Sequence, residues 1–232
     1  MKTINKFKKY SLIPMLSAAV LLTGCEKEAD EVPEAEHEHE VITNIHLVFT
    51  NAADTEDIVE AEAKLEEGDV DGFSIVDTIN LDASKKYDLT FEILNAHEDE
   101  HEEEEEEGEE EHEGEDIGAE ILEEADEHQV FFEFTEDIFT DPLGVGNIGD
   151  VDGKVNYNDY DGNMNPLGLE TTWTTSAESF QEGTFRVMLM HQPGSKSATS
   201  TSEDGDADFD LEFVININGS SIVATGASSN IQ

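Results

Sequence analysis

Apolar and polar residues alternate along much of this chain. In the stretch VITNIHLVFT, Ile45, Leu47 and Phe49 fall on one face of an extended backbone, whereas Asn44 and His46 fall on the other. A period of two predicts a half-buried β-strand. The same pattern, or a short apolar run between turn residues, predicts further strands at 58–65, 73–81, 87–94, 129–134, 154–160, 169–175, 184–191 and 209–217.

The predicted strands are short, and Gly, Asn, Asp and Pro punctuate the segments between them. This spacing predicts an all-β domain, an antiparallel β-sandwich of the immunoglobulin-like or a related kind. Within 115–127, Ile117, Ile121 and Ala125 recur every four residues, which is helical spacing. We expect a short helix or turn there that covers the sandwich, although Gly118 weakens the pattern.

Two acidic segments lie outside the strand pattern. Residues 25–40 contain almost no large apolar side chain, so burial cannot offset the entropy that would be lost on ordering. This composition predicts a disordered tether. Residues 96–127 are an acidic, His-rich insertion that predicts a long, mostly disordered loop. The predicted organisation is a signal peptide at 1–24, the tether at 25–40, the domain at 41–218 and a tail at 219–232.

The first 25 residues have the layout of a secretory signal. Four lysines precede an apolar stretch from Leu12 to Leu22, which is shorter than the ~20 apolar residues of a membrane-spanning helix. The ending Leu-Thr-Gly-Cys resembles the lipobox of bacterial lipoproteins, and the resemblance implies lipidation of Cys25. Acyl chains on Cys25 would anchor the mature chain to a membrane, at roughly 0.8 kcal/mol per buried methylene.

The next residues read Glu-Lys-Glu-Ala-Asp-Glu, at 26–31. They resemble the Lys-plus-acidic export signal of surface-exposed lipoproteins in the Bacteroidota. The resemblance implies an anchor in the outer membrane and a domain exposed at the cell surface. An ordinary acidic tether, with the domain on the periplasmic face, is the alternative.

Charge narrows the choice of partners. The 232 residues include 58 acidic and 11 basic side chains, for a formal charge of −47. Removal of residues 1–24 takes away four lysines and no acid, so the mature chain carries −51. Such a surface repels nucleic acid and anionic headgroups, and Arg186 is the one arginine for forked phosphate recognition. We expect cations or basic partners, and no nucleic acid.

Several phrases along the domain carry a family resemblance: VITNIHLVF, ASKKYDLTFEILN, EEADEHQVFFEF, NPLGLETTWTT and FRVMLMHQP. Together they resemble a Bacteroidota lipoprotein family often labelled "type 1 periplasmic binding fold superfamily protein". The resemblance spans most of 41–218 and implies an exported lipoprotein with a single β-rich domain. The chain itself lacks the alternating helical patterns of the βαβ units that build a periplasmic-binding fold, so its own pattern favours an all-β domain.

Histidine is concentrated around the acidic segments, and imidazole nitrogen favours zinc, nickel and copper over calcium and magnesium. The candidate metal ligands are His37, His39, His97, His101, His112, His128 and His191. Neighbouring carboxylates concentrate divalent cations, but they also favour the imidazolium, which must lose its proton to bind. We expect weak, exchangeable sites for zinc or another divalent cation, whose affinity falls below the histidine pH range. A passive solvated spacer is the alternative for residues 97–116.

Two of these histidines stand at the ends of predicted strands. His128 stands at a strand entrance after EEADE, and His191 ends a strand two residues before Pro193. Both occur in phrases that carry the family resemblance, so they could form part of a fixed site. A structural role as polar groups at strand ends is the alternative.

Acidic turns supply a second set of candidates. Calcium takes about six to eight oxygen ligands, which makes Asp150, Asp152, Asp159 and Asp161 candidate calcium ligands. The acidic turn with Asp204, Asp206 and Asp208 offers a similar set of oxygens. Their loops match only part of the EF-hand pattern. Asp-Gly pairs also occur in ordinary turns of β proteins, and that reading stays open.

Sequence motifs of catalysis are missing. Residues 144–149, GVGNIG, match a dinucleotide fingerprint, but no helical pattern follows them, and there is neither a GxSxG elbow nor an HExxH helix. We therefore expect no enzyme, but a membrane-anchored lipoprotein that scavenges zinc, with an outer-membrane transporter as a candidate partner. The alternative is a sandwich that binds glycan or protein, for which Trp173, Tyr157 and Tyr160 could supply stacking surfaces.

Overall fold

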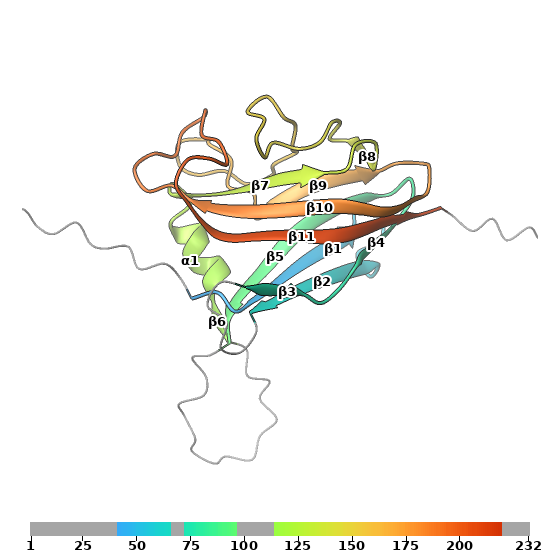
Figure 1. Cartoon of the computed structure of the whole chain (residues 1–232), viewed down its shortest axis with the longest axis horizontal. Helices are drawn as coiled ribbons and strands as arrows, with labels where there is room; N and C mark the ends of the chain where they lie inside the picture. The colour runs from blue at the N-terminus through green and yellow to red at the C-terminus, as the bar shows by residue number, and fades with distance from the viewer. Residues whose placement is uncertain (1–40, 66–71, 97–113, 220–232) are drawn as a thin grey trace, which may run out of the picture. The chain divides into compact units, whose positions relative to one another are not determined.

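The computed structural model describes residues 41–65, 72–96 and 114–219 (Figure 1). Nearly all of its regular structure is β-strand, which confirms the predicted all-β, sandwich-like domain. The elements are β1 (Asn44–Asn51), β2 (Ile58–Leu65), β3 (Phe73–Ile75), β4 (Ile79–Asp82), β5 (Lys86–Asn95), β6 (Glu115–Asp116), α1 (Ile117–Glu123), β7 (His128–Phe134), β8 (Phe139–Asp141), β9 (Glu170–Thr175), β10 (Phe180–His191) and β11 (Asp206–Asn218).

The first sheet, sheet A, has the strand order β3-β2-β1-β5-β9-β8, and β6 adds to β5. All of these pairs are antiparallel. In β1, Ile45, Leu47 and Phe49 are fully buried and alternate with half-buried residues. The sequence pattern of period two thus places one face of the sheet on the core.

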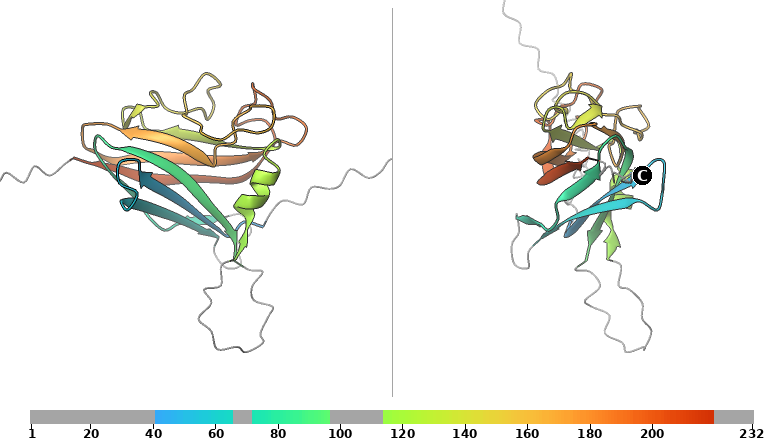
Figure 2. Two further views of the ribbon diagram at one scale, coloured as in Figure 1. Left: turned by 180° about the vertical axis from the view of Figure 1, so that it is seen from behind. Right: turned by 90° about the vertical axis from the view of Figure 1, so that its right-hand side faces the viewer.

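The second sheet, sheet B, has the order β4-β11-β10-β7. Strand β10 pairs antiparallel with β7 and β11, whereas β4 runs parallel to β11. The sandwich is therefore not antiparallel throughout. In Figures 1 and 2 the strands of sheet B lie across those of sheet A at an angle.

Aromatic side chains from both sheets fill the space between them. Trp173 of β9 meets Phe185 of β10 edge to face, with 5.1 Å between ring centroids, and Phe49 of β1 approaches the Phe185 ring to 5.8 Å. All three side chains are completely buried. Because burial of one such side chain contributes about 1.5–3 kcal/mol, this cluster is a main tie between the sheets.

Helix α1 covers one end of the sandwich, as the sequence predicted. The carboxylate of Asp116 accepts a hydrogen bond from the Ala119 amide and so caps the first turn. Ile117 and Ile121 are buried in the common core, and the helix packs on β5. Residues 114–127 of the acidic insertion thus belong to the fold. The predicted disorder at 97–113, the signal peptide, the tether and residues 220–232 of the tail lie outside the described residues.

Two predicted strands differ from the structure. Residues 73–81 divide into β3 in sheet A and β4 in sheet B, because the chain crosses between the sheets at 76–78. Residues 154–160 form a loop with isolated bridges at Tyr157 and Tyr160. Val155 and Tyr157 pack against the core from this loop, which explains its strand-like alternation.

Candidate metal centre

Two histidines face each other at one end of sheet B. His128 begins β7, His191 ends β10, and the antiparallel register places them directly opposite one another. On each strand the histidine follows the row of side chains that face the core. The next pair in these rows, Val130 and Leu189, is also buried. The two rings are stacked, with centroids 4.5 Å apart and planes inclined by 6°. Strand pairing therefore brings two buried imidazoles together at the edge of the core.

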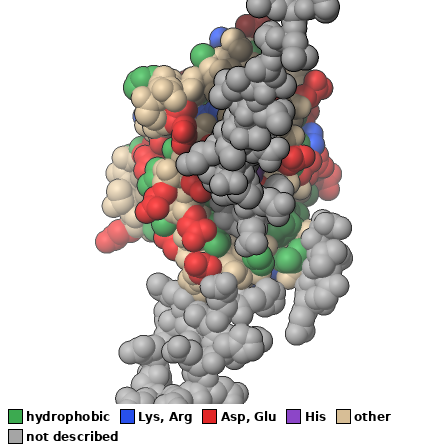
Figure 3. All heavy atoms as spheres, turned by 90° about the vertical axis from the view of Figure 1, so that its left-hand side faces the viewer, with side chains coloured by type: hydrophobic (Ala, Val, Ile, Leu, Met, Phe, Trp, Pro, Cys, Tyr) green, Lys and Arg blue, Asp and Glu red, His purple; other side chains and the backbone are tan. Residues whose placement is uncertain are grey.

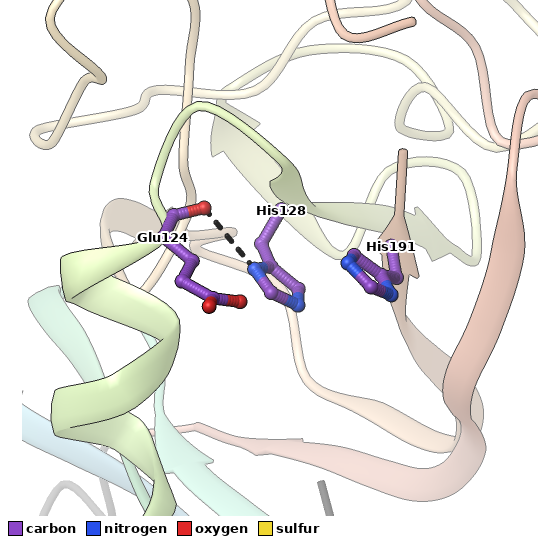
Figure 4. A group of neighbouring side chains, drawn as sticks. All are labelled: Glu124, His128 and His191. Carbon is purple, nitrogen blue, oxygen red and sulfur yellow. Dashed lines mark hydrogen bonds between the residues drawn. The ribbon is translucent and has the colours of Figure 1, made fainter. Parts of the chain in front are cut away.

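The turn between α1 and β7 orients His128. Glu124 ends the helix, and its carbonyl oxygen lies 3.2 Å from Nδ1 of His128 (Figure 4). A carbonyl oxygen can only accept, so Nδ1 carries the hydrogen. In the neutral ring Nε2 is then the atom that can bind a metal ion, and this hydrogen-bond pattern is the usual one for a metal-binding histidine.

The carboxylate of Glu124 completes a group of three. One ligand atom each from Glu124, His128 and His191 lies within 4.8 Å of the others, and among residues 41–65, 72–96 and 114–219 this is the one such group of His, Cys, Asp or Glu. Figure 4 shows the His128 ring between the other two side chains. Two imidazoles and a carboxylate are a donor set that suits zinc and related transition metals.

Two further carboxylates approach the rings. Oε2 of Glu127 lies 3.4 Å from Nε2 of His191, and Oδ2 of Asp208 lies 3.7 Å from Nε2 of His128. The Asp208 side chain is only 2% exposed, whereas that of Glu127 is 23% exposed. On the described surface at this end of the sandwich, acidic side chains are more prominent than basic ones (Figure 3). The surroundings of the histidine pair therefore favour a cation.

The structure brings together only part of the predicted metal ligands. His128 and His191 meet, whereas His37, His39, His97, His101 and His112, like Cys25, lie outside the described residues. His46 lies apart from the pair, on β1, where its Nε2 is 3.5 Å from Oε1 of Glu62.

Two of the candidate calcium ligands, Asp150 and Asp159, organise loops. Oδ1 of Asp150 accepts the amide hydrogen of Asp152, as in an ordinary Asp turn. The carboxylate of Asp159 accepts hydrogen bonds from the amides of Gly168 and Glu170, at 2.8 and 3.1 Å. Burial raises the pKa of Asp159 above its usual range, against the effect of these hydrogen bonds. These carboxylates hold the backbone of the loops.

Asp161, the fourth candidate, belongs to a buried ion pair. Its Oδ1 accepts the amide hydrogens of Asn163 and Asn165, and its Oδ2 lies 3.4 Å from Nζ of Lys196. Lys196 also donates to the carbonyl of Ala125, so it joins this loop to the end of α1. Burial opposes ionisation of Asp161, but the hydrogen bonds and the Lys196 charge outweigh it and lower its pKa.

The aromatic residues considered for glycan stacking differ in exposure. Trp173 is fully buried, and its Nε1 donates to Oγ1 of Thr171. The Tyr157 hydroxyl donates to the carbonyl of Val130 at 2.8 Å, and burial raises its pKa to about 12. Tyr160 is 47% exposed. Of the three rings, only that of Trp173 is fully buried and so unavailable for stacking on a ligand, whereas Tyr157 is half-buried.

Sequence reasoning missed Glu124 and Glu127 as ligands and considered Asp208 only as part of an acidic turn for calcium. Glu124, Glu127 and Asp208 stand in acidic stretches where nothing local distinguishes them from their neighbours. The available signal was the spacing of four residues between Glu124 and His128, across the end of the predicted helix.

In the part of the chain that the structure describes, no helix has the length and apolar character to cross a membrane. Comparison of the chain with protein-family models, with curated proteins and with solved structures finds no match. The function is therefore inferred from the geometry around Glu124, His128 and His191.

Proposed function

We propose that the protein binds a divalent transition-metal ion, zinc first, at the His128–His191 pair with Glu124 as the neighbouring carboxylate. The observation that carries the proposal is the burial of two stacked imidazoles with a carboxylate oxygen in reach of both. A histidine with only a structural role at a strand end needs one hydrogen-bond partner. Here two histidines from neighbouring strands lie together, and carboxylates approach both rings, which is the composition of a metal centre.

The surroundings support the binding of a cation. Nδ1 of His128 donates a hydrogen bond to the Glu124 carbonyl, so Nε2 is the ring atom that can bind the metal ion. Both imidazoles are buried, and Glu124 is the most exposed member of the group. The formal charge of −47 draws cations toward the whole molecule.

The proposal includes the anchor. Lipidation at Cys25 would hold the mature chain on the outer membrane, with the domain at the cell surface or, alternatively, on the periplasmic face. There the acidic, His-rich segments would raise the local concentration of divalent ions and the centre would retain one. Such a protein would scavenge metal or deliver it to an outer-membrane uptake partner.

Calorimetric titration with zinc tests the proposal on the chain from residue 26 onward, which contains every described residue. The double variant His128→Gln and His191→Gln should lose at least about 100-fold in affinity at one site, since loss of an outer-shell partner alone costs roughly 10–100-fold. His46→Gln is the matched control, because His46 lies on β1 beside Glu62. It should titrate like the unmodified chain.

A second variant separates the centre from the acidic segment. His97→Gln, His101→Gln and His112→Gln together should remove weak sites and leave the tight one. If the unmodified chain and the His128/His191 variant bind zinc with the same affinities and stoichiometry, the proposed metal centre is refuted. Metal analysis of protein purified without added ions identifies the ion that it retains.

A further inference from the structure

Asp208 is the most deeply buried carboxylate next to the histidine pair, with 2% of its side chain exposed. We propose that Asp208 is a further ligand of the same ion, so that the centre holds it with four protein side chains and leaves no position open to solvent. This inference rests on the proposed function, because it concerns the ion bound by His128 and His191.

A β-bulge explains why Asp208 faces inward. Leu189 pairs with Phe209 but Met190 pairs with Ala207, so Asp208 is the extra residue on β11. Farther along β11, Asp210 belongs to the alternating set of exposed residues that the regular pattern produces. Bulges re-aim side chains and are frequent near functional sites. Here the bulge turns one acid of an otherwise solvent-facing row toward His128.

The contact between Asp208 and His128 has the geometry to hold a cation. Nδ1 of His128 donates to the Glu124 carbonyl, and Nε2 of the same ring lies 3.7 Å from Oδ2 of Asp208. A proton on Nε2 makes this contact an ion pair, and a metal ion that binds both atoms takes the place of that proton.

The separation suits a shared metal ion. Two ligands of a tetrahedral zinc ion lie roughly 3.3 Å apart when the bonds are about 2.0–2.1 Å long. The 3.7 Å between Nε2 and Oδ2 is close to this value. Asp208 is outside the group of three whose ligand atoms lie within 4.8 Å of one another, so ligation requires its carboxylate to move toward Glu124 and His191.

Charge balance also favours Asp208. Two neutral imidazoles and Glu124 alone would leave a dipositive ion with one uncompensated charge. Glu127 is also near, but its side chain is 23% exposed, whereas Asp208 brings its charge to a buried position, where an uncompensated ion is costly. A second carboxylate makes the ion and its ligands neutral together. Four protein ligands are the arrangement of closed zinc sites that retain their ion, whereas catalytic sites keep an open position.

Cobalt absorption spectroscopy tests the inference on the same chain from residue 26. Four-coordinate Co²⁺ absorbs visible light far more strongly than six-coordinate Co²⁺, and azide alters the spectrum only where it can reach the ion. We expect an intense spectrum that azide leaves unchanged. Asp208→Asn should lower cobalt and zinc affinity by about 10-fold or more and make the spectrum sensitive to azide.

Asp206→Asn is the matched control, since it removes the same charge from an exposed position two residues away on β11. It should behave like the unmodified chain. Circular dichroism shows whether Asp208→Asn folds. If it does not, the azide response of the unmodified chain still tests the closed site. A change in that cobalt spectrum on addition of azide would refute a site without an open position.

The two proposals fail in different ways. Equal affinities of Asp208→Asn and the unmodified chain, with binding still lost in the His128/His191 variant, would reject Asp208 as a ligand and leave the proposed function intact. Absence of any cobalt or zinc binding that depends on His128 and His191 would reject the proposed function itself.

Discussion

At the scale of single residues, the buried ion pair of Lys196 and Asp161 shows how the loops around the centre are fixed. Both side chains are wholly buried, and Lys196 also bonds the Ala125 carbonyl at the end of α1. Lys196→Met should lower the free energy of unfolding by about 3 kcal/mol, because it leaves the Asp161 charge buried without its cation. Urea denaturation measures this change.

Lys86→Met is the control for that variant. Lys86 is exposed on β5, so its replacement should stay within about 0.5 kcal/mol of the unmodified chain. A loss of the same size in both variants would show that the buried pair contributes nothing particular.

The site was partly predictable at this scale. His128 and His191 could be singled out as strand-end histidines, because each stands at the edge of an apolar run. Their meeting depends on the register between two strands that are about 60 residues apart in sequence, and local patterns contain no information on register. Asp208 depends on a bulge, which no alternation of residues announces.

At the scale of elements, the connection from β10 to β11 holds His191 in place. Gly205 has φ +92°, and a Cβ there would collide with the carbonyl oxygen of His191. Gly205→Ala should therefore lower stability by more than the roughly 1–2 kcal/mol that a left-handed backbone alone costs, and should weaken zinc binding because His191 must shift. Denaturation and zinc titration measure the two effects.

Gly194 supplies a comparison in the same connection. It has φ +64°, with no atom near the position of a Cβ, so Gly194→Ala adds backbone strain without a collision. The expected loss is about 1–2 kcal/mol with zinc affinity unchanged. Equal zinc affinities in the Gly205 and Gly194 variants would contradict the link between this connection and His191.

Most strands were predictable because each satisfies a local rule. Residues 58–65 form β2 with the predicted bounds, since alternation and turn residues both mark its ends. Residues 73–81 were predicted as one strand because the apolar residues Phe73, Ile75, Ile79 and Leu81 all stand at odd-numbered positions. The chain crosses from one sheet to the other between them without breaking this alternation. A sequence pattern tells which side of a strand is buried, but not which sheet the strand joins.

At the scale of the whole molecule, a bound ion should stabilise the fold, because the centre joins the α1–β7 turn to the end of β10. Zinc at 100 times its dissociation constant adds about 2.7 kcal/mol. For a domain of this size that raises the melting temperature by roughly 5–10 °C. Calorimetric melting with and without zinc, alongside the His128/His191 variant, measures the shift. A shift that persists in the variant would place the stabilising ion elsewhere.

The high negative charge predicts a salt dependence. The 58 acidic residues repel one another, and salt shortens the Debye length from about 30 Å at 0.01 M to about 3 Å at 1 M. Urea midpoints should rise as sodium chloride is added, and potassium chloride should act alike. A fall in the midpoint would mean that attractive pairs such as Arg186 with Asp210 outweigh the repulsion.

The place of β11 has a consequence for the order of folding. The last strand of the domain lies inside sheet B, hydrogen-bonded to β10 on one side and, in parallel, to the early strand β4 on the other. A nascent chain therefore cannot close its core before residue 218 has left the ribosome, and pairings this distant in sequence form slowly. Truncation of β11 should therefore leave β4 and β10 without their shared neighbour and prevent sheet B from forming.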